Sequence, residues 1–327
     1  MRTRAVLIDR PGGPEVLRLA EQGVPEPGPG QVVLHHTAIG VNFLDVQHRT
    51  GRYPLPAYPA PIGFEAAGVV EQVGPGVDTL RIGDRVVYGF PPPGSYADRR
   101  CVSTGHLVPV PDGIGDDMAA ALFNKAVTAH YLLHTTRPVT AGETILVHAA
   151  AGGVGSLLCQ WAAAKGVKVI GTVSSAAKAR IAVDNGCAHV IDYATEDFTA
   201  GVRGITDGKG VPVVFDSIGQ DTVEGSLRCL SSRGMLVSFG TASGPIPLFD
   251  LFRLNQMGSL YVTSPGYVAH TQERDELLWR ASDVFAALAA GTLRQAAPRI
   301  YPLADVAQAH RDLQGRAVLG VAVLKPE

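Results

Sequence analysis

The stretch HAAAGGVG, residues 148–155, restricts the fold of this 327-residue chain more than any other. Small residues in a row bury little surface and lose much backbone entropy on folding, so a run of them needs a physical reason. The stretch lies between TILVHAA (144–150), which is typical of a buried strand, and VGSLLCQWAAAKG (154–166), which is typical of a helix. A strand that enters a helix through glycine indicates that the backbone itself must come close to something.

The spacing of these small residues fits a dinucleotide-binding fingerprint. Positions 150, 152 and 155 match G-x-G-x-x-G with alanine in place of the first glycine. Gly152 would let the backbone approach a pyrophosphate, and Gly155 would let the helix pack closely on the strand. The free N–H groups at the start of the helix would then hold the anion. A glycine-rich turn that binds nothing is the alternative, and the position between a strand and a helix favours the nucleotide site.

Strands and helices alternate through the second half of the chain. Runs typical of strands occur at 168–174, 189–193, 211–219 and 234–240, and runs typical of helices at 116–136 and 177–186. This alternation predicts βαβ units and a parallel sheet. A further helix at 278–291 and a last strand at 320–326 follow.

The first 120 residues have a different texture. Short β-type runs at 31–41, 66–74 and 85–89 are separated by Pro-Gly stretches such as PEPGPG and PPPG. This pattern predicts a compact, irregular β domain. A length of 327 residues also fits two domains.

Composition narrows the classes of function. The formal net charge is -2 and no basic block is present, so nucleic acid is disfavoured as a partner. We expect no signal peptide, because the apolar run at the N-terminus is short and is followed at once by charge, proline and glycine. We expect no membrane helix, because no apolar run reaches roughly 18 residues. The four cysteines, at 101, 159, 187 and 229, form no C-x-x-C pair. They predict no disulfide framework and fit a reducing, cytoplasmic setting.

The end of the second predicted strand distinguishes between NAD and NADP. An NAD site usually offers an acidic side chain there, but residues 172–175 read TVSS. Lys178 and Arg180 follow, and hydroxyl groups with cations suit a 2′-phosphate. We therefore predict NADPH as the cofactor. The alternative, that both cations are a solvated helix face, is favoured for Arg180 and not for Lys178.

Several linked motifs recur in the order of a known family. They are GGPEVL (12–17), AIGVNFLDV (38–46), GDRVVYG (83–89), HAAAGGVG (148–155), FDSIGQDT (215–222), LVSFG (236–240) and GSLYVT (258–263). Together they resemble the zinc-free quinone oxidoreductases, the zeta-crystallin-like branch of the medium-chain dehydrogenase/reductases. The resemblance spans nearly the whole chain.

The resemblance implies a two-domain α/β fold and a homodimer. A GroES-like catalytic domain would comprise residues 1–125 and be completed by 264–327, and a Rossmann domain would comprise residues 126–263. The active cleft would lie between the domains. Edge strands of the Rossmann sheets, here GSLYV (258–262), would join two copies of the chain.

The resemblance also assigns residues to the site. Near the nicotinamide it implies Asn42 and Phe43 with Asp45 behind them, Thr128 and Tyr131 on the first helix of the Rossmann domain, and an arginine, Arg316, that reaches back to the cofactor. For the pyrophosphate it implies Gly152, Gly153 and Val154. For the adenosine ribose phosphate it implies Ser174, Lys178 and Tyr193, and for the ribose and nicotinamide half Ser217, Phe239 and Gly240.

Three positions depart from the family pattern. Gln47 and Ser264 stand where tyrosine and arginine are common, and Phe64 stands in GFE where the family has GTE or GxE. We expect Phe64 to narrow the substrate pocket. The sequence therefore leaves the physiological acceptor open.

We predict that no metal takes part. Zinc-dependent relatives carry cysteine and histidine ligands at the positions of Asn42 and Phe64, and neither residue can supply a thiolate or an imidazole. Without zinc, hydride transfer needs an acceptor that is already electrophilic, such as a quinone or an enone. The candidate catalytic residues are Asn42, Thr128 and Tyr53, although Tyr53 could equally anchor its loop. Lys125 could line the site or lie on a helix surface.

Three functions remain open at this point. The leading prediction is an NADPH:quinone reductase. An enone or enal double-bond reductase on the same scaffold is the close alternative. A protein that binds NADPH without catalysis is the third, and it is disfavoured because no arginine-rich stripe offers a nucleic-acid surface.

Overall fold

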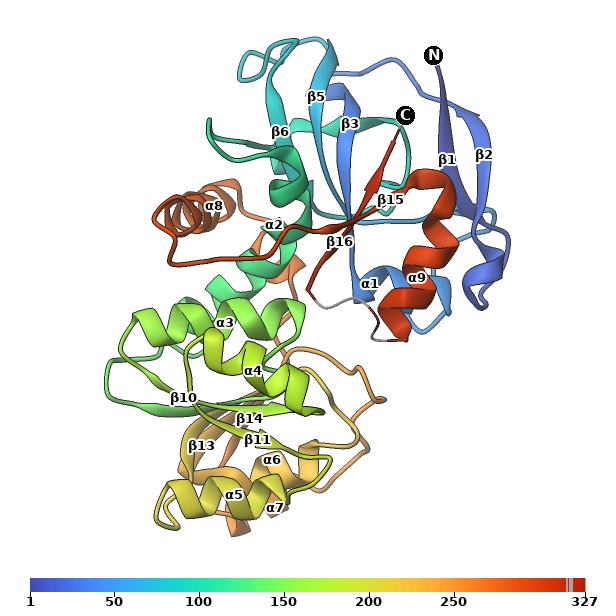
Figure 1. Ribbon diagram of the computed structural model, residues 1–327. Coiled ribbons are helices and arrows are strands. Elements are labelled where there is room, and N and C mark those ends of the chain that lie inside the picture. Colours follow the sequence, from blue (N-terminus) through green and yellow to red (C-terminus); the bar gives the residue numbers. More distant parts are fainter. Residues whose placement is uncertain (316, 318–319, 327) are drawn as a thin grey trace. The chain divides into compact units, whose positions relative to one another are not determined.

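The computed structural model describes residues 1–315, 317 and 320–326 (Figure 1). These residues form two compact units. Unit 1 comprises residues 1–124, 272–289 and 295–327, and unit 2 comprises residues 125–271 and 290–294. The domain boundaries predicted at 125/126 and 263/264 stay predictions.

Unit 1 is rich in antiparallel strands. Its strands are β1 (Arg2–Ile8), β2 (Arg18–Gly23), β3 (Gln31–Val41), β4 (Ala60–Pro61), β5 (Glu65–Val73), β6 (Arg85–Gly89), β7 (Arg99–Ser103), β8 (Val108–Pro109), β15 (Arg299–Pro302) and β16 (Ala322–Lys325). Its α-helices are α1 (Phe43–Arg49), α8 (Arg274–Ala289) and α9 (Val306–Gln314), with 3₁₀ turns at Pro14–Val16, Thr104–His106 and Leu303–Asp305. α2 (Asp116–Tyr131) begins in unit 1 and ends in unit 2.

Two sheets organise unit 1. The smaller has the order β2-β1-β4, and the larger has the order β15-β16-β3-β5-β6-β8 with β7 also paired to β3. In Figure 1 the red strand β16 lies beside the blue strand β3, to which it pairs antiparallel. The end of the chain thus completes a sheet that its beginning starts, and side chains such as Val6, Ile39 and Leu324 close one common core.

Unit 2 is built on a parallel sheet. Its strands are β9 (Thr144–Val147), β10 (Lys168–Val173), β11 (Cys187–Asp192), β12 (Val211–Asp216), β13 (Leu230–Ser238) and β14 (Tyr261–Thr263). Its helices are α3 (Gly153–Ala164), α4 (Ala176–Asp184), α5 (Phe198–Ile205), α6 (Val223–Cys229) and α7 (Phe252–Gln256), with a π-helical turn at Leu132–Thr136 and a 3₁₀ turn at Val268–His270.

The strand order of this sheet indicates where a ligand would bind. The strands follow β11-β10-β9-β12-β13-β14, and every neighbouring pair is parallel. In Figure 1 α3 and α4 cover one face of the sheet, and α5 and α6 cover the other. The chain therefore leaves β9 toward one side and later returns to its other side at β12. Ligands of open α/β sheets bind at such a switch point, beyond the carboxyl ends of the strands.

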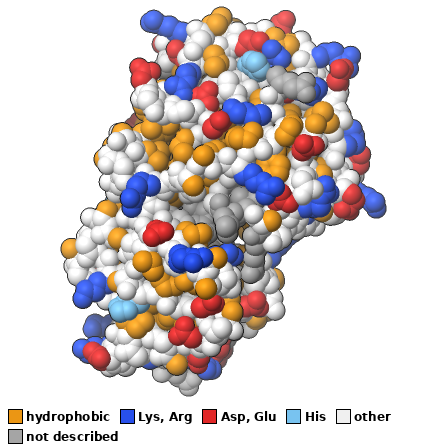
Figure 2. All heavy atoms as spheres, in the orientation of Figure 1, with side chains coloured by type: hydrophobic (Ala, Val, Ile, Leu, Met, Phe, Trp, Pro, Cys, Tyr) orange, Lys and Arg blue, Asp and Glu red, His pale blue; other side chains and the backbone are white. Residues whose placement is uncertain are grey.

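Charged side chains of both signs occur on the surface (Figure 2), and the absence of a nucleic-acid partner stays a prediction. On the face drawn in Figure 2, basic and acidic side chains are interspersed rather than gathered by sign. Among the helices that the structure describes, none is long and apolar enough to cross a bilayer.

Candidate cofactor site and active site

The glycine loop connects β9 to α3 at the switch point of unit 2. Gly152 is the N-cap of α3, and its carbonyl oxygen accepts the first helical bond at 2.8 Å, so the amides of Gly153 and Val154 lie at the open end of the helix. A Cβ on Gly155 would lie 2.2 Å from the backbone oxygen of Ala149. Glycine is therefore required at 155 for the close approach of helix and strand that the sequence indicates.

A lysine on α2 lies against this loop. Lys125 is 8% exposed, and its Cδ atom lies 3.0 Å from the position that a Cβ on Gly153 would take. The burial excludes the surface-helix interpretation that the sequence left open. Thr128 and Tyr131 follow on the same helix and are also buried, and the ring of Tyr131 stacks on that of His270 with centroids 4.4 Å apart.

The three residues predicted for the ribose phosphate come together at the ends of neighbouring strands. Ser174 follows β10, and its Oγ accepts a hydrogen bond of 3.3 Å from Nζ of Lys178 on α4. Tyr193 follows β11, and its N–H donates to the backbone oxygen of Val173 at 3.1 Å. Arg180 is exposed, as the solvated-face interpretation expects, whereas Lys178 is half-buried.

The strand ends on the other side of β9 also meet. Ser217 follows β12, and Phe239 and Gly240 follow β13. The N–H of Phe239 donates to the backbone oxygen of Asp216 at 2.9 Å, and a Cβ on Gly240 would lie 2.8 Å from the backbone oxygen of Ser217. Gly240 therefore lets the two strand ends lie side by side.

A buried polar network beneath the loop was not predicted from the sequence. Asp216 accepts hydrogen bonds from the hydroxyls of Thr222 and Ser226, at 2.7 and 2.8 Å to its Oδ2. The ring of His148 bonds to the hydroxyls of Thr172 and Ser226, at 2.8 and 2.9 Å. Burial lowers the pKa of His148, so its ring is neutral. The network joins β9, β10, β12 and α6, and its only sequence signal is a histidine inside an apolar run.

In unit 1 the predicted residue Asn42 is held by two carboxyl groups. Its backbone N–H donates to Oδ2 of Asp45 at 2.8 Å, and its Nδ2 donates to Oε2 of Glu65 at 2.7 Å. The other oxygen of Glu65 accepts the backbone N–H of Asn124 at 2.5 Å, and Asp45 also accepts the hydroxyl of Tyr96 at 2.9 Å. Asp45 and Glu65 are fully buried, and their hydrogen bonds hold Asn42 in one position.

Several aromatic side chains lie on α1 and in the segments that contact it. Phe43 and Tyr53 are exposed, and the ring of Tyr53 meets that of His48 edge-on at 5.7 Å. The ring of Phe64 stacks on the ring of His48, with centroids 4.9 Å apart. Gln47, which replaces the family's tyrosine, is buried. Tyr53 thus remains available to a ligand while its backbone anchors the loop by an N–H bond of 3.1 Å to Gln47.

Ser264 and Arg316 are the two remaining positions that the sequence singles out. Ser264 is exposed after β14. Arg316 lies outside the described residues, so its predicted role at the cofactor stays a prediction.

The chain matches two families of known proteins. Residues 28–112 match the alcohol dehydrogenase GroES-like domain, and residues 153–280 match the zinc-binding dehydrogenase family. With the β-rich unit and the parallel sheet, these matches confirm the predicted fold class, a GroES-like domain plus a Rossmann-type domain.

Zinc, which the second of these names implies, does not fit the residues present. Zinc takes cysteine, histidine and carboxylate ligands, whereas positions 42 and 64 hold an amide and a phenyl ring. The amide of Asn42 is bonded to Glu65, and the ring of Phe64 is stacked on His48. In the described part of the chain, no three side chains of His, Cys, Asp and Glu gather as a metal site would require.

Full-length relatives place the chain within this superfamily. The quinone oxidoreductase of Pseudomonas aeruginosa is 46% identical over 96% of this chain and 97% of its own length. The 2-haloacrylate reductase of a Burkholderia species is 45% identical over 99% of each chain. The crystal structure of Escherichia coli quinone oxidoreductase complexed with NADPH covers 99% of this chain and 100% of its own, with 42% identity and a TM-score of 0.97. The chain therefore belongs to the quinone oxidoreductase branch of the medium-chain dehydrogenase/reductase superfamily.

Proposed function

We propose that this protein is an NADPH-dependent quinone oxidoreductase that works without a metal. The observation that carries the proposal is the cluster of Ser174, Lys178 and Tyr193, which follow β10, lie on α4 and follow β11, respectively. It supplies a cation and hydroxyl groups where an NAD site would supply a carboxylate. The Escherichia coli relative was crystallised with NADPH, which supports the same cofactor here.

The chain offers each part of NADPH a suitable partner. The amides of Gly153 and Val154 at the open end of α3 would hold the pyrophosphate. Lys178 and Ser174 would hold the 2′-phosphate. Asp192 ends β11 nearby, but its Oδ1 accepts the N–H of Ala194 at 3.1 Å and is thus engaged in its own turn. We assign the ribose and nicotinamide half to Thr128, Ser217, Phe239 and Gly240, together with Asn42 and Phe43.

The chemistry demands little acid–base machinery. When bound, NADPH supplies a hydride, and with one proton a quinone becomes a hydroquinone. The chain then has to orient the reactants, a contribution that can be worth several powers of ten in rate. We assign this role to Asn42, whose amide Glu65 holds, and we assign to the exposed hydroxyl of Tyr53 a hydrogen bond to the acceptor.

An enone or enal reductase is the second candidate, and one relative favours it. The 45%-identical Burkholderia protein is named a 2-haloacrylate reductase, which acts on a carbon–carbon double bond next to a carboxyl group. Both functions use the same cofactor and an electrophilic acceptor. They differ in the acceptor that the region around Phe64 and Gln47 admits.

One assay separates the candidates. NADPH oxidation is followed at 340 nm with 1,4-benzoquinone, with 2-alkenals and with 2-chloroacrylate. We expect turnover with the quinone. Turnover with the alkenes alone would replace the proposed function by the second candidate, and NADPH binding without any turnover would leave a binding protein.

We also propose that two copies of the chain pair through β14. This strand is the edge of the parallel sheet, and Tyr261 on it is exposed together with Leu251 and Phe252 of the preceding segment. An exposed apolar edge strand is a ready surface for pairing. Light scattering should give twice the mass of one chain, and Tyr261→Asp should halve it while Ile82→Asp, at another exposed apolar site, should not.

The cysteines support a reducing compartment for the protein, and we propose the cytoplasm. All four, Cys101, Cys159, Cys187 and Cys229, are free thiols, and burial raises the pKa of Cys229 to about 12. A deeply buried thiol such as Cys229 is an inert structural residue rather than a nucleophile.

A further inference from the structure

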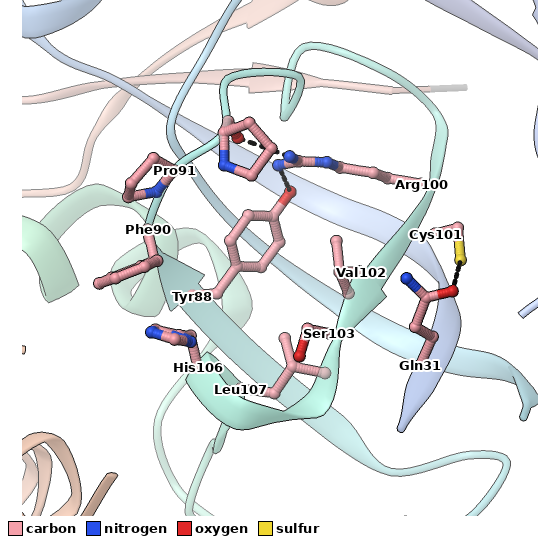
Figure 3. Close-up of a pocket in the computed structure, with 11 residues that line it drawn as sticks. Gln31, Tyr88, Phe90, Pro91, Arg100, Cys101, Val102, Ser103, His106 and Leu107 are labelled. Carbon is pink, nitrogen blue, oxygen red and sulfur yellow. Dashed lines mark hydrogen bonds between the residues drawn. The ribbon is translucent and has the colours of Figure 1, made fainter. Parts of the chain in front are cut away.

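Unit 1 contains a cavity that is lined by none of the residues assigned above. Its volume is about 270 Å³, and it lies between β3, β6 and β7 and the loop that follows β6 (Figure 3). Phe90, Pro91, Val102 and Leu107 supply apolar walls. Cavities that hold drug-sized ligands are usually larger, roughly 300–1,000 Å³, so this one suits a single-ring molecule.

One wall carries a positive charge without an acidic partner. Arg100 on β7 donates from Nη1 to the hydroxyl of Tyr88 at 3.2 Å and from Nη2 to the backbone oxygen of Pro92 at 2.5 Å. No carboxylate pairs with it among the described residues. The adjacent Arg99 is different, because its Nε lies 2.8 Å from Oε2 of Glu71. Arg100 is therefore a fixed guanidinium whose charge is balanced by no acidic side chain in the part of the chain that the structure describes.

The tyrosine that holds this arginine is itself fixed from behind. Tyr88 is 3% exposed, and its hydroxyl lies 3.0 Å from Nε2 of His36, whose Nδ1 lies 2.7 Å from the backbone oxygen of Ala97. Burial lowers the pKa of His36 to about 4, so its ring is neutral and Nδ1–H donates to Ala97. The Tyr88 hydroxyl then donates to His36 and accepts from Arg100, which holds the guanidinium in place before any ligand arrives.

A second polar group at the cavity lacks a partner. Nε2 of His106 is fully buried and has no hydrogen-bond partner among the described residues. Its ring lies against that of Phe90. In Figure 3 His106 and Arg100 lie at opposite ends of the lining. Buried polar atoms are nearly always paired in native proteins, so this atom points to a missing ligand or water.

We propose that this cavity is a second small-molecule site, and that it takes a carboxylate borne on a single aromatic ring. The carboxylate would pair with Arg100, and the ring would lie on Phe90, Val102 and Leu107. An anion is required because the lining holds an unbalanced cation and no acidic residue among those described. An apolar body is required because an inorganic anion would leave the apolar walls exposed to water.

Calorimetry on the full chain tests both requirements, with benzoate, benzamide and inorganic phosphate as probes. We expect benzoate to bind at one saturable site, at least ten-fold more tightly than the other two. Equal affinity for phosphate would show that only charge is recognised, and equal affinity for benzamide that only the ring is; either result overturns the proposal. Displacement of benzoate by saturating NADPH would assign it to the cofactor site and would also overturn it.

Variants and a chemical probe locate the bound benzoate. Arg100→Gln should weaken it at least ten-fold, and the matched control Arg99→Gln should leave it unchanged. The probe needs no variant: Cys101 lines the cavity and is half-buried, so benzoate should slow its alkylation by iodoacetamide in the native protein, as read by peptide mass. Unchanged alkylation at saturating benzoate would place any binding elsewhere and overturn the proposal, even if Arg100→Gln fails to fold.

Discussion

The glycine loop and the segment around Asn42 are built in opposite ways. The loop offers backbone amides at the open end of α3. It requires residues without side chains, because a Cβ on Gly155 would lie 2.2 Å from the backbone oxygen of Ala149. The Asn42 segment depends on side chains that are present, with Asp45 and Glu65 fully buried around it. We infer that the glycine loop, which binds through its backbone, is damaged by any substitution that adds atoms. The Asn42 segment, which is held by side chains, is damaged by any substitution that removes a hydrogen-bond acceptor.

The largest expected effect is at Gly155. Gly155→Ala must move α3 away from β9, because the Cβ would meet backbone that cannot rotate aside. Overpacking of this kind typically costs about 1–3 kcal/mol. We expect NADPH affinity to fall by about 100-fold or more, measured by fluorescence titration, because the amides at the start of α3 lose their alignment.

The matched control is Gly204→Ala on α5, where an added Cβ would meet nothing within 4 Å. It should leave the affinity unchanged and should not destabilise the helix. Full NADPH affinity in a folded Gly155→Ala variant would contradict the backbone account of the loop.

The same contrast explains what the sequence could and could not predict. Adjacent residues form the loop, so its fingerprint lies in the six consecutive positions 150–155. In the same way, β3 is found at Gln31–Val41, where its run of β-type residues predicted it. The Asn42 network joins Glu65, Tyr96 and, through a 3.1 Å bond, His310. No local pattern marks a hydrogen bond between residues 42 and 65, or 96 and 310. Such a network follows only from the way β3, β5 and α9 pack.

Glu65→Gln tests the side-chain half of the comparison. Two N–H donors, from Asn42 and Asn124, face the two oxygens of Glu65, and glutamine offers one acceptor and one donor in their place. One of these bonds must be lost and the Asn42 amide becomes free to turn. Misplaced catalytic groups cost on the order of 10²-fold in rate, and we expect a loss of that order in quinone turnover.

A double variant shows whether Glu65 acts through Asn42. In an Asn42→Ala background, Glu65→Gln should lower turnover little further, because the group that it positions is already gone. Losses that multiply would mean that Glu65 has a separate role. Unfolding by urea, followed in parallel, distinguishes a loss of fold from a loss of position.

Replacing Lys178 tests whether a side chain of unit 2 determines the preference for NADPH over NADH. Lys178→Ala removes the cation bonded to Ser174 and should weaken NADPH about ten-fold while NADH changes little, as expected for one charge-assisted bond. Arg180→Ala, at an exposed position two residues on, is the control and should change neither affinity. Equal losses for both cofactors would remove the argument for the 2′-phosphate.

The smallest expected effect on function comes from lowering the pH. Acid lowers the stability of the fold through the side-chain network of unit 1. Burial, and next the charge of Arg49, hold the pKa of His310 at about 3, while the unfolded chain takes up that proton below about 6.5. The unfolded state binds more protons between these values, so stability falls as pH decreases through this window. From pH 7 to pH 5 His310 should cost about 2 kcal/mol, so over this range the unfolding free energy of His310→Gln in urea should have a pH slope shallower by about 1 kcal/mol per unit on average. The exposed His189→Gln variant should keep the wild-type slope. Parallel curves for wild type and His310→Gln would mean that His310 binds its proton as readily in the fold as in the unfolded chain, in spite of its burial and of the charge of Arg49, and would contradict the prediction.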